Sequence, residues 1–160
     1  MPGSWGHLAR RFFWSLRAAR LTVDETAEVR AMLPDHLAAA FFDQPRADVR
    51  HGLDCARHVR HGGGSADLVL AALVHDIGKR HARLGVVGRS LASLLARLHL
   101  PAPGRLGIYL DHAVLGADEL SRLGAPELVV HLTRHHHGPR PAGVDEEDWK
   151  LFAAADSTVV

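Results

Sequence analysis

Apolar residues recur at intervals of three and four along most of the chain, which places them on one face of an α-helix. No stretch of useful length alternates between apolar and polar residues, as a half-buried strand would. The predicted helices cover 22–33, 35–43, 45–61, 66–77, 86–99, 106–112, 114–123, 126–136 and 145–158. The pattern therefore predicts an all-α fold, a bundle of about seven to nine helices without internal repeats.

Residues with strong positional preferences support several of these helix ends. Thr22 and Glu25 have the spacing of a capping box, in which each side chain accepts a hydrogen bond from a backbone amide of the first turn. Pro45 is suited to the first position of a helix because its fixed φ is already helical. Ser65 is suited to an N-cap, and Gly78 is suited to a left-handed residue that ends the helix over 66–77.

The segment 66–77 differs from the others because its apolar residues are nearly continuous, from Leu68 to Val74. A buried strand is the alternative, since periodicity alone does not classify a short apolar run. The two alanines, the N-cap and the length favour a helix that is buried on most sides. It ends abruptly in His75 and Asp76, and burying such polar groups is costly unless a partner satisfies them.

Residues 1–20 carry four arginines, no acidic residue and a stripe of large apolar side chains. Contact with a membrane surface through this segment is one interpretation. The helical spacing of the stripe, which consists of Trp5, Leu8, Phe12 and Leu16, instead favours a terminal helix that docks on the protein. No apolar region of the kind found in secretory signals follows the arginines.

Composition places the chain among ordinary globular proteins, with 160 residues, 47% hydrophobic residues and a formal net charge of +1. We expect one domain, in which helices within 1–44 pack on a core formed by 45–160. A near-neutral charge gives no reason to expect nucleic acid as a partner. The single cysteine, Cys55, excludes an internal disulfide, and a cytoplasmic setting is the default expectation. No apolar run approaches the roughly 20 residues that a membrane span requires.

Four polar residues interrupt predicted buried segments in the same manner. His51 lies on the helix over 45–61, His75 and Asp76 end the apolar run, and Asp156 follows the apolar stretch "LFAAA". Histidine is the commonest side-chain ligand of metals, and the chain contains 13 of them. The four residues together form the pattern H…HD…D, which would satisfy them all if they met at one cation.

This pattern resembles the HD-domain superfamily of metal-dependent phosphohydrolases, which is named for the His-Asp pair. The resemblance rests on "RHGLDCARHV", "SADLVLAALVHDIGK" and "LFAAAD" and spans roughly 46–156. It implies a helical bundle in which His51, His75, Asp76 and Asp156 hold a divalent metal in the interior. Two imidazoles and two carboxylates suit Mn, Fe, Co, Ni or Zn, and the sequence does not choose among them.

Further histidines match relatives that hold two metals, the HD-GYP proteins among them. His112 begins an "HxxxGAxxL" element, and "RHHHGP" supplies a run of three histidines. When the apolar residues before the run are aligned with those of these relatives, His136 and His137 match their double histidine. An alignment shifted by one residue would place His135 in the pair instead of His137. His131 and His135 lie one helical turn apart, and we expect no metal there.

The chain also departs from those relatives. The Gly-Tyr-Pro element that follows the double histidine in HD-GYP proteins is missing, which makes cyclic diguanylate an unlikely substrate for this chain. The acidic pair that follows the His-Asp pair in guanosine tetraphosphate hydrolases is missing too, since Lys79 and Arg80 stand near that place.

The resemblance implies hydrolysis of a small phosphorylated substrate, nucleotide-like in our expectation, by metal-activated hydroxide, with one or two ions bound. Asp76 would position or bridge the metals, and Lys79 and Arg50 are candidates to hold phosphate oxygens. Solvated surface positions are the alternative for both cations, and His81 is the candidate for the acid that protonates the leaving group. The competing hypothesis is a regulatory or interaction module that keeps the fold and the metal without catalysis. The sequence predicts neither the exact substrate nor the oligomeric state.

Overall fold

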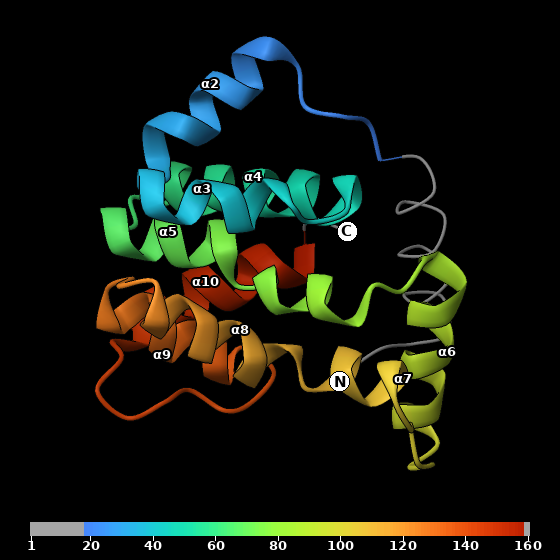
Figure 1. Cartoon of the computed structure of the whole chain (residues 1–160). Helices are drawn as coiled ribbons and strands as arrows, with labels where there is room; N and C mark the ends of the chain where they lie inside the picture. Colours follow the sequence, from blue (N-terminus) through green and yellow to red (C-terminus); the bar gives the residue numbers. More distant parts are fainter. Residues whose placement is uncertain (1–17, 159–160) are drawn as a thin grey trace.

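A computed structural model describes residues 18–158, and within that range every regular element is a helix. The α-helices, with their labels in Figure 1, are α2 (Val23–Met32), α3 (Asp35–Phe42), α4 (Arg46–His61), α5 (Ala66–Val74), α6 (Val86–Arg97), α7 (Arg105–Leu110), α8 (His112–Arg122), α9 (Glu127–His135) and α10 (Glu146–Thr158). A 3₁₀ helix, η1 (Ile77–Ala82), follows α5. The predicted all-α fold is therefore confirmed, while the aromatic stripe within residues 1–17 lies outside the described residues.

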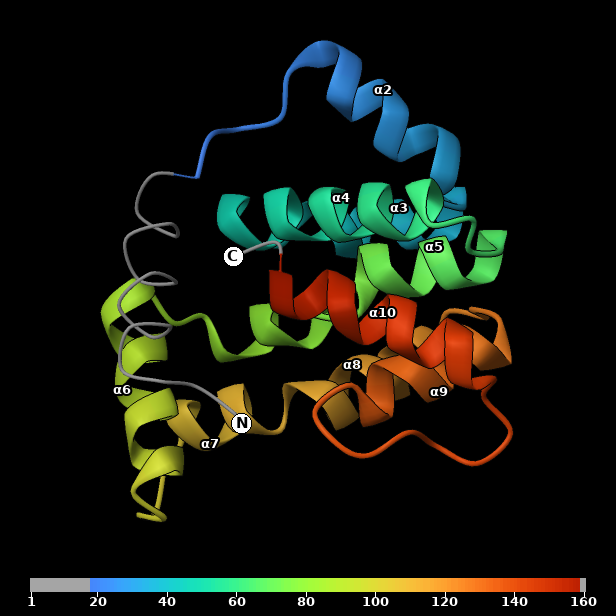
Figure 2. The ribbon, with the colours of Figure 1, turned by 180° about the vertical axis from the view of Figure 1, so that it is seen from behind.

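The helices are arranged around α5, whose residues from Leu68 to Val74 are all buried. α4 packs along α5, while α9 and α10 cover other sides of it, so α5 has protein on most of its surface. In Figure 2, where the molecule is seen from behind, α10 lies below α5 and above α8 and α9. The main core joins residues of α2, α3, α4, α5, α8, α9 and α10, so one apolar interior holds the bundle together.

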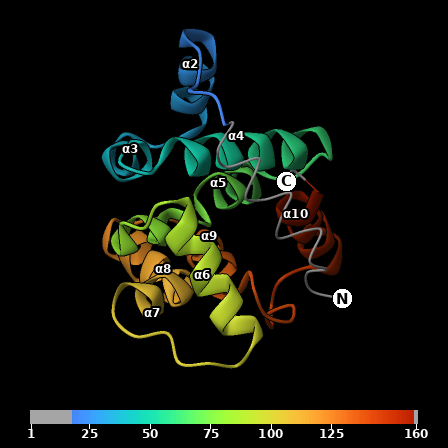
Figure 3. The same cartoon turned by 90° about the vertical axis from the view of Figure 1, so that its right-hand side faces the viewer.

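Helices α6 and α7 lie at one side of this bundle. Figure 3 shows α6 inclined against the direction of α4. A small separate core of Ala82, Ala92 and Tyr109 connects η1, α6 and α7. Several large apolar side chains of α6 remain outside it, including Val87 at 74% exposure.

Predicted caps are present where polar side chains begin a helix. Thr22 Oγ1 accepts from the Glu25 amide, and the Glu25 carboxylate accepts from the Thr22 amide, which completes the capping box. Ser65 Oγ accepts from the Leu68 amide at the start of α5. These local hydrogen bonds explain why the two helices begin where the sequence indicates.

The prediction for the end of α5 was wrong. α5 ends at Val74, and Gly78 lies inside η1 without the positive φ of a left-handed cap; Arg83, with a φ of 47°, has that conformation at the end of η1 instead. Gly78 is needed for a different reason, which is close packing against α8. A Cβ atom on Gly78 would stand 2.7 Å from the Gly116 amide nitrogen and 2.9 Å from the His112 carbonyl carbon. This contact between η1 and α8 brings His112 next to the end of α5.

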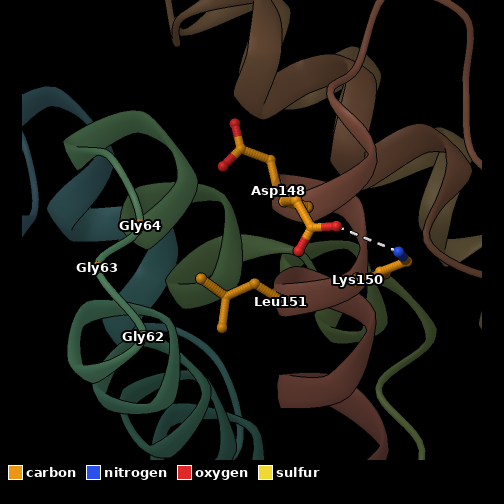
Figure 4. A pocket seen from close by; sticks show the side chains of 7 residues that line it. Gly62, Gly63, Gly64, Asp148, Lys150 and Leu151 are labelled. Atoms are coloured by element: carbon orange, nitrogen blue, oxygen red, sulfur yellow. Dashed lines mark hydrogen bonds and ion pairs between the residues drawn. The ribbon is translucent and has the colours of Figure 1, made fainter.

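The N-terminal end of α10 packs against the turn between α4 and α5. Figure 4 shows Leu151 beside the backbone of Gly62, Gly63 and Gly64, and a Cβ atom on Gly62 would collide with the Leu151 side chain. α10 is thereby fixed against α4, which matters because Asp156 lies near its other end. Over the described residues, no helix combines the length and apolar character that a membrane crossing requires.

Candidate metal centre

The first group of polar side chains forms where α4, the end of α5 and α10 meet. His51 Nε2 lies 3.2 Å from Asp156 Oδ1, and His75 Nε2 lies 3.3 Å from the same oxygen. Asp76 Oδ2 lies 3.9 Å from His51 Nε2 and 3.6 Å from His75 Nε2. The structure thus brings together four residues that are as much as 105 positions apart in the chain.

The second group comes from the start of α8 and the end of α9. His112 Nε2 lies 3.3 Å from His136 Nε2 and 3.1 Å from His137 Nε2. α9 ends at His135, and His136 is its C-cap with a backbone that is still helical. His135 is exposed, and its ring lies beside that of His131, 5.0 Å away between centroids. The structure therefore groups His136 and His137 with His112 and leaves His135 outside.

Asp76 connects the two groups. Its Oδ2 faces His51 and His75, whereas its Oδ1 lies 3.3 Å from His112 Nε2 and 3.6 Å from His136 Nε2. The side chain is only 4% exposed. Each carboxylate oxygen thus serves one group, which is the arrangement of a bridging ligand.

Hydrogen bonds to the backbone determine which ring nitrogen of each histidine faces the centre. Nδ1 of His75, His112 and His136 lies 2.9, 2.6 and 2.6 Å, respectively, from the carbonyl oxygen three residues earlier. A carbonyl oxygen only accepts hydrogen bonds, so Nδ1 carries the proton in each case. The Nε2 atoms are then directed into the centre, as in histidines that bind metals.

This arrangement leaves electron-rich atoms facing one another without protons between them. Burial lowers the pKa of His112, which keeps the ring neutral. Its Nε2 lone pair then faces His136 Nε2 at 3.3 Å, a contact that a proton or a metal cation between the two nitrogens would stabilise. In addition, His75 Nε2 and Asp76 Oδ1 are buried without a hydrogen-bond partner. The donor set therefore fits divalent transition metals, for which imidazole nitrogen and carboxylate oxygen are suitable ligands.

The carboxylates give the first group a strongly negative character. Burial acts to lower the pKa of His75, but Asp76 and Asp156 outweigh it and raise that pKa to about 8. Burial acts to raise the pKa of Asp156, but the hydrogen bond with His51 and the close contact with the His75 imidazole hold it well below its usual range. Both carboxylates are consequently ionised near neutral pH and available to a cation.

Comparison with known proteins agrees with this geometry. Residues 49–158, more than half of the chain, match the family model described as the HD domain. The chain belongs to the HD-domain family. A search of the curated proteins and a search of the solved structures found no match. The HD domain implies membership of a superfamily of metal-dependent phosphohydrolases.

The two groups of side chains joined by Asp76 together form what we call the HD-domain centre. Lys79 and Arg50 were expected near this centre, and the structure places only Lys79 there. The Lys79 side chain is 4% exposed, and its Nζ forms an ion pair with Asp76 Oδ2. Arg50 instead donates to both carboxylate oxygens of Glu25 at 2.5 and 2.7 Å, and to the Arg20 carbonyl oxygen. Neighbouring residues on a helix point about 100° apart, so Arg50 points away from the HD-domain centre while His51 points into it. His81 also has a different partner, since its Nε2 lies 2.8 Å from Glu119 Oε2.

One residue beside the HD-domain centre was not anticipated from the sequence. Cys55 is fully buried one turn after His51, with its Sγ 3.5 Å from His51 Nε2 and 3.5 Å from the Ala155 carbonyl oxygen. It therefore packs between the two helices that supply His51 and Asp156. The spacing of four residues from His51 was the available signal, because residues four apart share one helix face.

Proposed function

We propose that this chain is a metal-dependent phosphohydrolase that cleaves a small phosphate ester, nucleotide-like in character. The observation that carries the proposal is the position of the Asp76 carboxylate, with one oxygen toward each group of imidazoles. Two donor groups that share a carboxylate are typical of centres that act on phosphate esters with a pair of metal ions.

His51, His75, Asp76 and Asp156 would hold one ion, and His112, His136, His137 and Asp76 would hold a second. Divalent ions bound there supply Lewis acidity, which lowers the pKa of water toward neutrality and offsets negative charge on a phosphoryl group. The chemistry of the ligands admits Mn, Fe, Co, Ni or Zn.

The protein's own residues prepare this site before substrate arrives. The carbonyl oxygens of Ala72, Tyr109 and Thr133 fix the histidine rings, so their Nε2 atoms need no reorientation to act as ligands. Burial of Asp76 excludes water from its carboxylate and strengthens its interaction with nearby cations. Both features lower the reorganisation that accompanies binding.

Lys79 is the residue we assign to the phosphate. Its ammonium pairs with Asp76 Oδ2, and burial keeps that interaction away from competing water. With a metal bound at this centre, the Lys79 ammonium would be placed to hold a non-bridging phosphoryl oxygen as a point charge. Lys79→Met is then expected to raise KM and lower kcat while retaining bound metal.

The test combines metal content with turnover. The full chain is purified, its bound metal is measured, and hydrolysis of p-nitrophenyl phosphate, bis-p-nitrophenyl phosphate and a panel of nucleotides is followed with added Mn²⁺, Co²⁺ or Zn²⁺. Asp76→Ala is expected to remove metal and activity together, while circular dichroism shows the helix content of the wild type. Asp118→Ala, which removes an exposed carboxylate on α8, is the matched control and is expected to change neither.

Two results would contradict the proposal. Equal metal content in the wild type and Asp76→Ala would show that the assigned residues are not ligands. Bound metal without turnover on any phosphate ester would instead favour a regulatory module that retains the HD fold.

A further inference from the structure

A buried ion pair lies outside the metal ligands but is connected to one of them. Arg89 of α6 donates from Nη1 to Asp48 Oδ1 at 2.7 Å and from Nη2 to Asp48 Oδ2 at 2.6 Å. The two side chains are 13% and 8% exposed. Arg89 Nε also donates to the Leu84 carbonyl oxygen at 3.1 Å, so its guanidinium is held in one orientation. The pair joins the first turn of α4 to α6.

The same guanidinium contacts the aromatic ring that supports the second donor group. The central carbon of the Arg89 guanidinium lies 5.7 Å from the centre of the Tyr109 ring, within the range of a cation–π interaction. Tyr109 is 8% exposed and belongs to the small core between η1, α6 and α7. Arg89 therefore restricts the position of Tyr109 from the side of α6.

Tyr109 in turn fixes the His112 ring at two points. The Tyr109 carbonyl oxygen lies 2.6 Å from His112 Nδ1, and the two rings pack 5.7 Å apart at an angle of 32°. The opposite ring nitrogen of His112 is the one that faces Asp76, His136 and His137. The direction of that lone pair thus depends on where Tyr109 lies.

We propose that Asp48 and Arg89 are positioning residues for the second metal site, acting through Tyr109 on His112. This inference rests on the proposed function, because it takes the group of His112, His136 and His137 as a metal site. The first group receives its side chains from α4, from the two residues directly after α5 and from α10. Within residues 18–158, none of its hydrogen bonds, ion pairs or ring contacts involves Tyr109. The pair should therefore control the second ion more strongly than the first.

Replacing both charges together separates positioning from stability. Arg89→Met alone would leave Asp48 buried without a partner, and that variant can fail to fold. The double variant Asp48→Leu/Arg89→Met removes both charges, and such replacements of buried pairs are often neutral or stabilising. The double variant keeps apolar side chains beside Tyr109 but removes the Arg89 guanidinium and its two hydrogen bonds to Asp48.

Co²⁺ is the probe, because its visible absorption reports the ligands of each bound ion. In the full-length wild type we expect two equivalents with distinct spectra. In Asp48→Leu/Arg89→Met the first equivalent is expected to bind as in the wild type, whereas the second binds at least about tenfold more weakly and with an altered spectrum, as is typical when support of a ligand is lost. The melting temperature is expected to match or exceed that of the wild type.

The matched control is Asp118→Leu/Arg134→Met. This exposed pair, 2.5 Å between Nη2 and Oδ1, joins α8 to α9, the two helices next to the second donor group, but does not contact Tyr109. We expect wild-type binding of both equivalents. Wild-type affinity for two Co²⁺ ions in Asp48→Leu/Arg89→Met would overturn the positioning role alone, as would an equal loss of both equivalents. A wild type that binds only one Co²⁺ would overturn the positioning role together with the two-metal site.

Discussion

The contact between Gly78 and α8 predicts a strong effect for a very small substitution, Gly78→Ala. The added methyl group would stand 2.7 Å from the Gly116 nitrogen and 2.9 Å from the His112 carbonyl carbon, and closer still to the oxygen of that carbonyl. All of these are main-chain atoms, so no side-chain rotation relieves the overlap. The start of α8 must move away from η1 by about 1 Å, an overpacking that costs roughly 1–3 kcal/mol or more in the free energy of unfolding.

The same movement carries His112 away from Asp76. Displacements of about 1 Å in a reacting site can reduce rates by about 100-fold. We therefore expect Gly78→Ala to lower the urea midpoint, weaken binding of the second metal equivalent and reduce hydrolysis by about that factor. Chemical denaturation followed by circular dichroism, together with Co²⁺ titration, measures the first two effects.

Two further glycines provide a graded comparison. A Cβ atom on Gly116 would stand 3.0 Å from the Gly78 nitrogen and 3.2 Å from Ile77 Cγ2, so Gly116→Ala should have a smaller effect. A Cβ atom on Gly88 would meet only the flexible Leu84 side chain, at 3.1 Å, and a helical alanine is favoured over glycine by up to about 1 kcal/mol. Gly88→Ala is therefore the neutral or stabilising control. Wild-type stability and metal binding in Gly78→Ala would refute the reasoning.

Two other predictions concern the histidine run and the partly buried ion pair of Glu25 and Arg50. His137→Ala is expected to weaken the second metal equivalent, whereas His135→Ala leaves both unchanged; metal analysis of the two variants distinguishes the alignments, and the opposite result would move the ligand to His135. Hydrogen bonding to Arg50 lowers the pKa of Glu25 from 4.5 to about 2. The stabilisation from this pair is therefore fully present above about pH 4.5 and is lost as the pH falls toward 2. Melting temperatures of the wild type and Glu25→Gln should converge over that interval, and a constant difference would contradict the assignment.

The sequence predicts the helices well because their ends carry local signals. Thr22 and Ser65 cap their helices in the structure as their side-chain chemistry requires. The fold class and the HD-domain family follow from the apolar periodicity and from the His-Asp pair. The caps and the apolar periodicity depend on residues close together in the chain, for which spacing is informative. The family resemblance combines three short segments of this kind between residues 46 and 156.

The parts that the sequence did not predict depend on contacts between distant segments. A glycine directly after a predicted helix is typical of a left-handed cap, and this pattern led to the prediction for Gly78. Its role is instead set by close packing against α8, which begins 34 positions later. The Arg50 guanidinium is suited to binding phosphate, but it forms an ion pair with Glu25 on α2. The alignment of the three histidines was open because periodicity stops applying at His135, where α9 ends.

The position of Asp76 between two donor groups has a thermodynamic consequence. One carboxylate faces both donor groups, so a cation bound at either group would withdraw electron density from the carboxylate that the other group shares. The two occupancies are then linked, and linkage requires that each alters the affinity of the other by the same factor. Because both groups share the Asp76 carboxylate, the metal occupancy of one group would depend on the metal occupancy of the other.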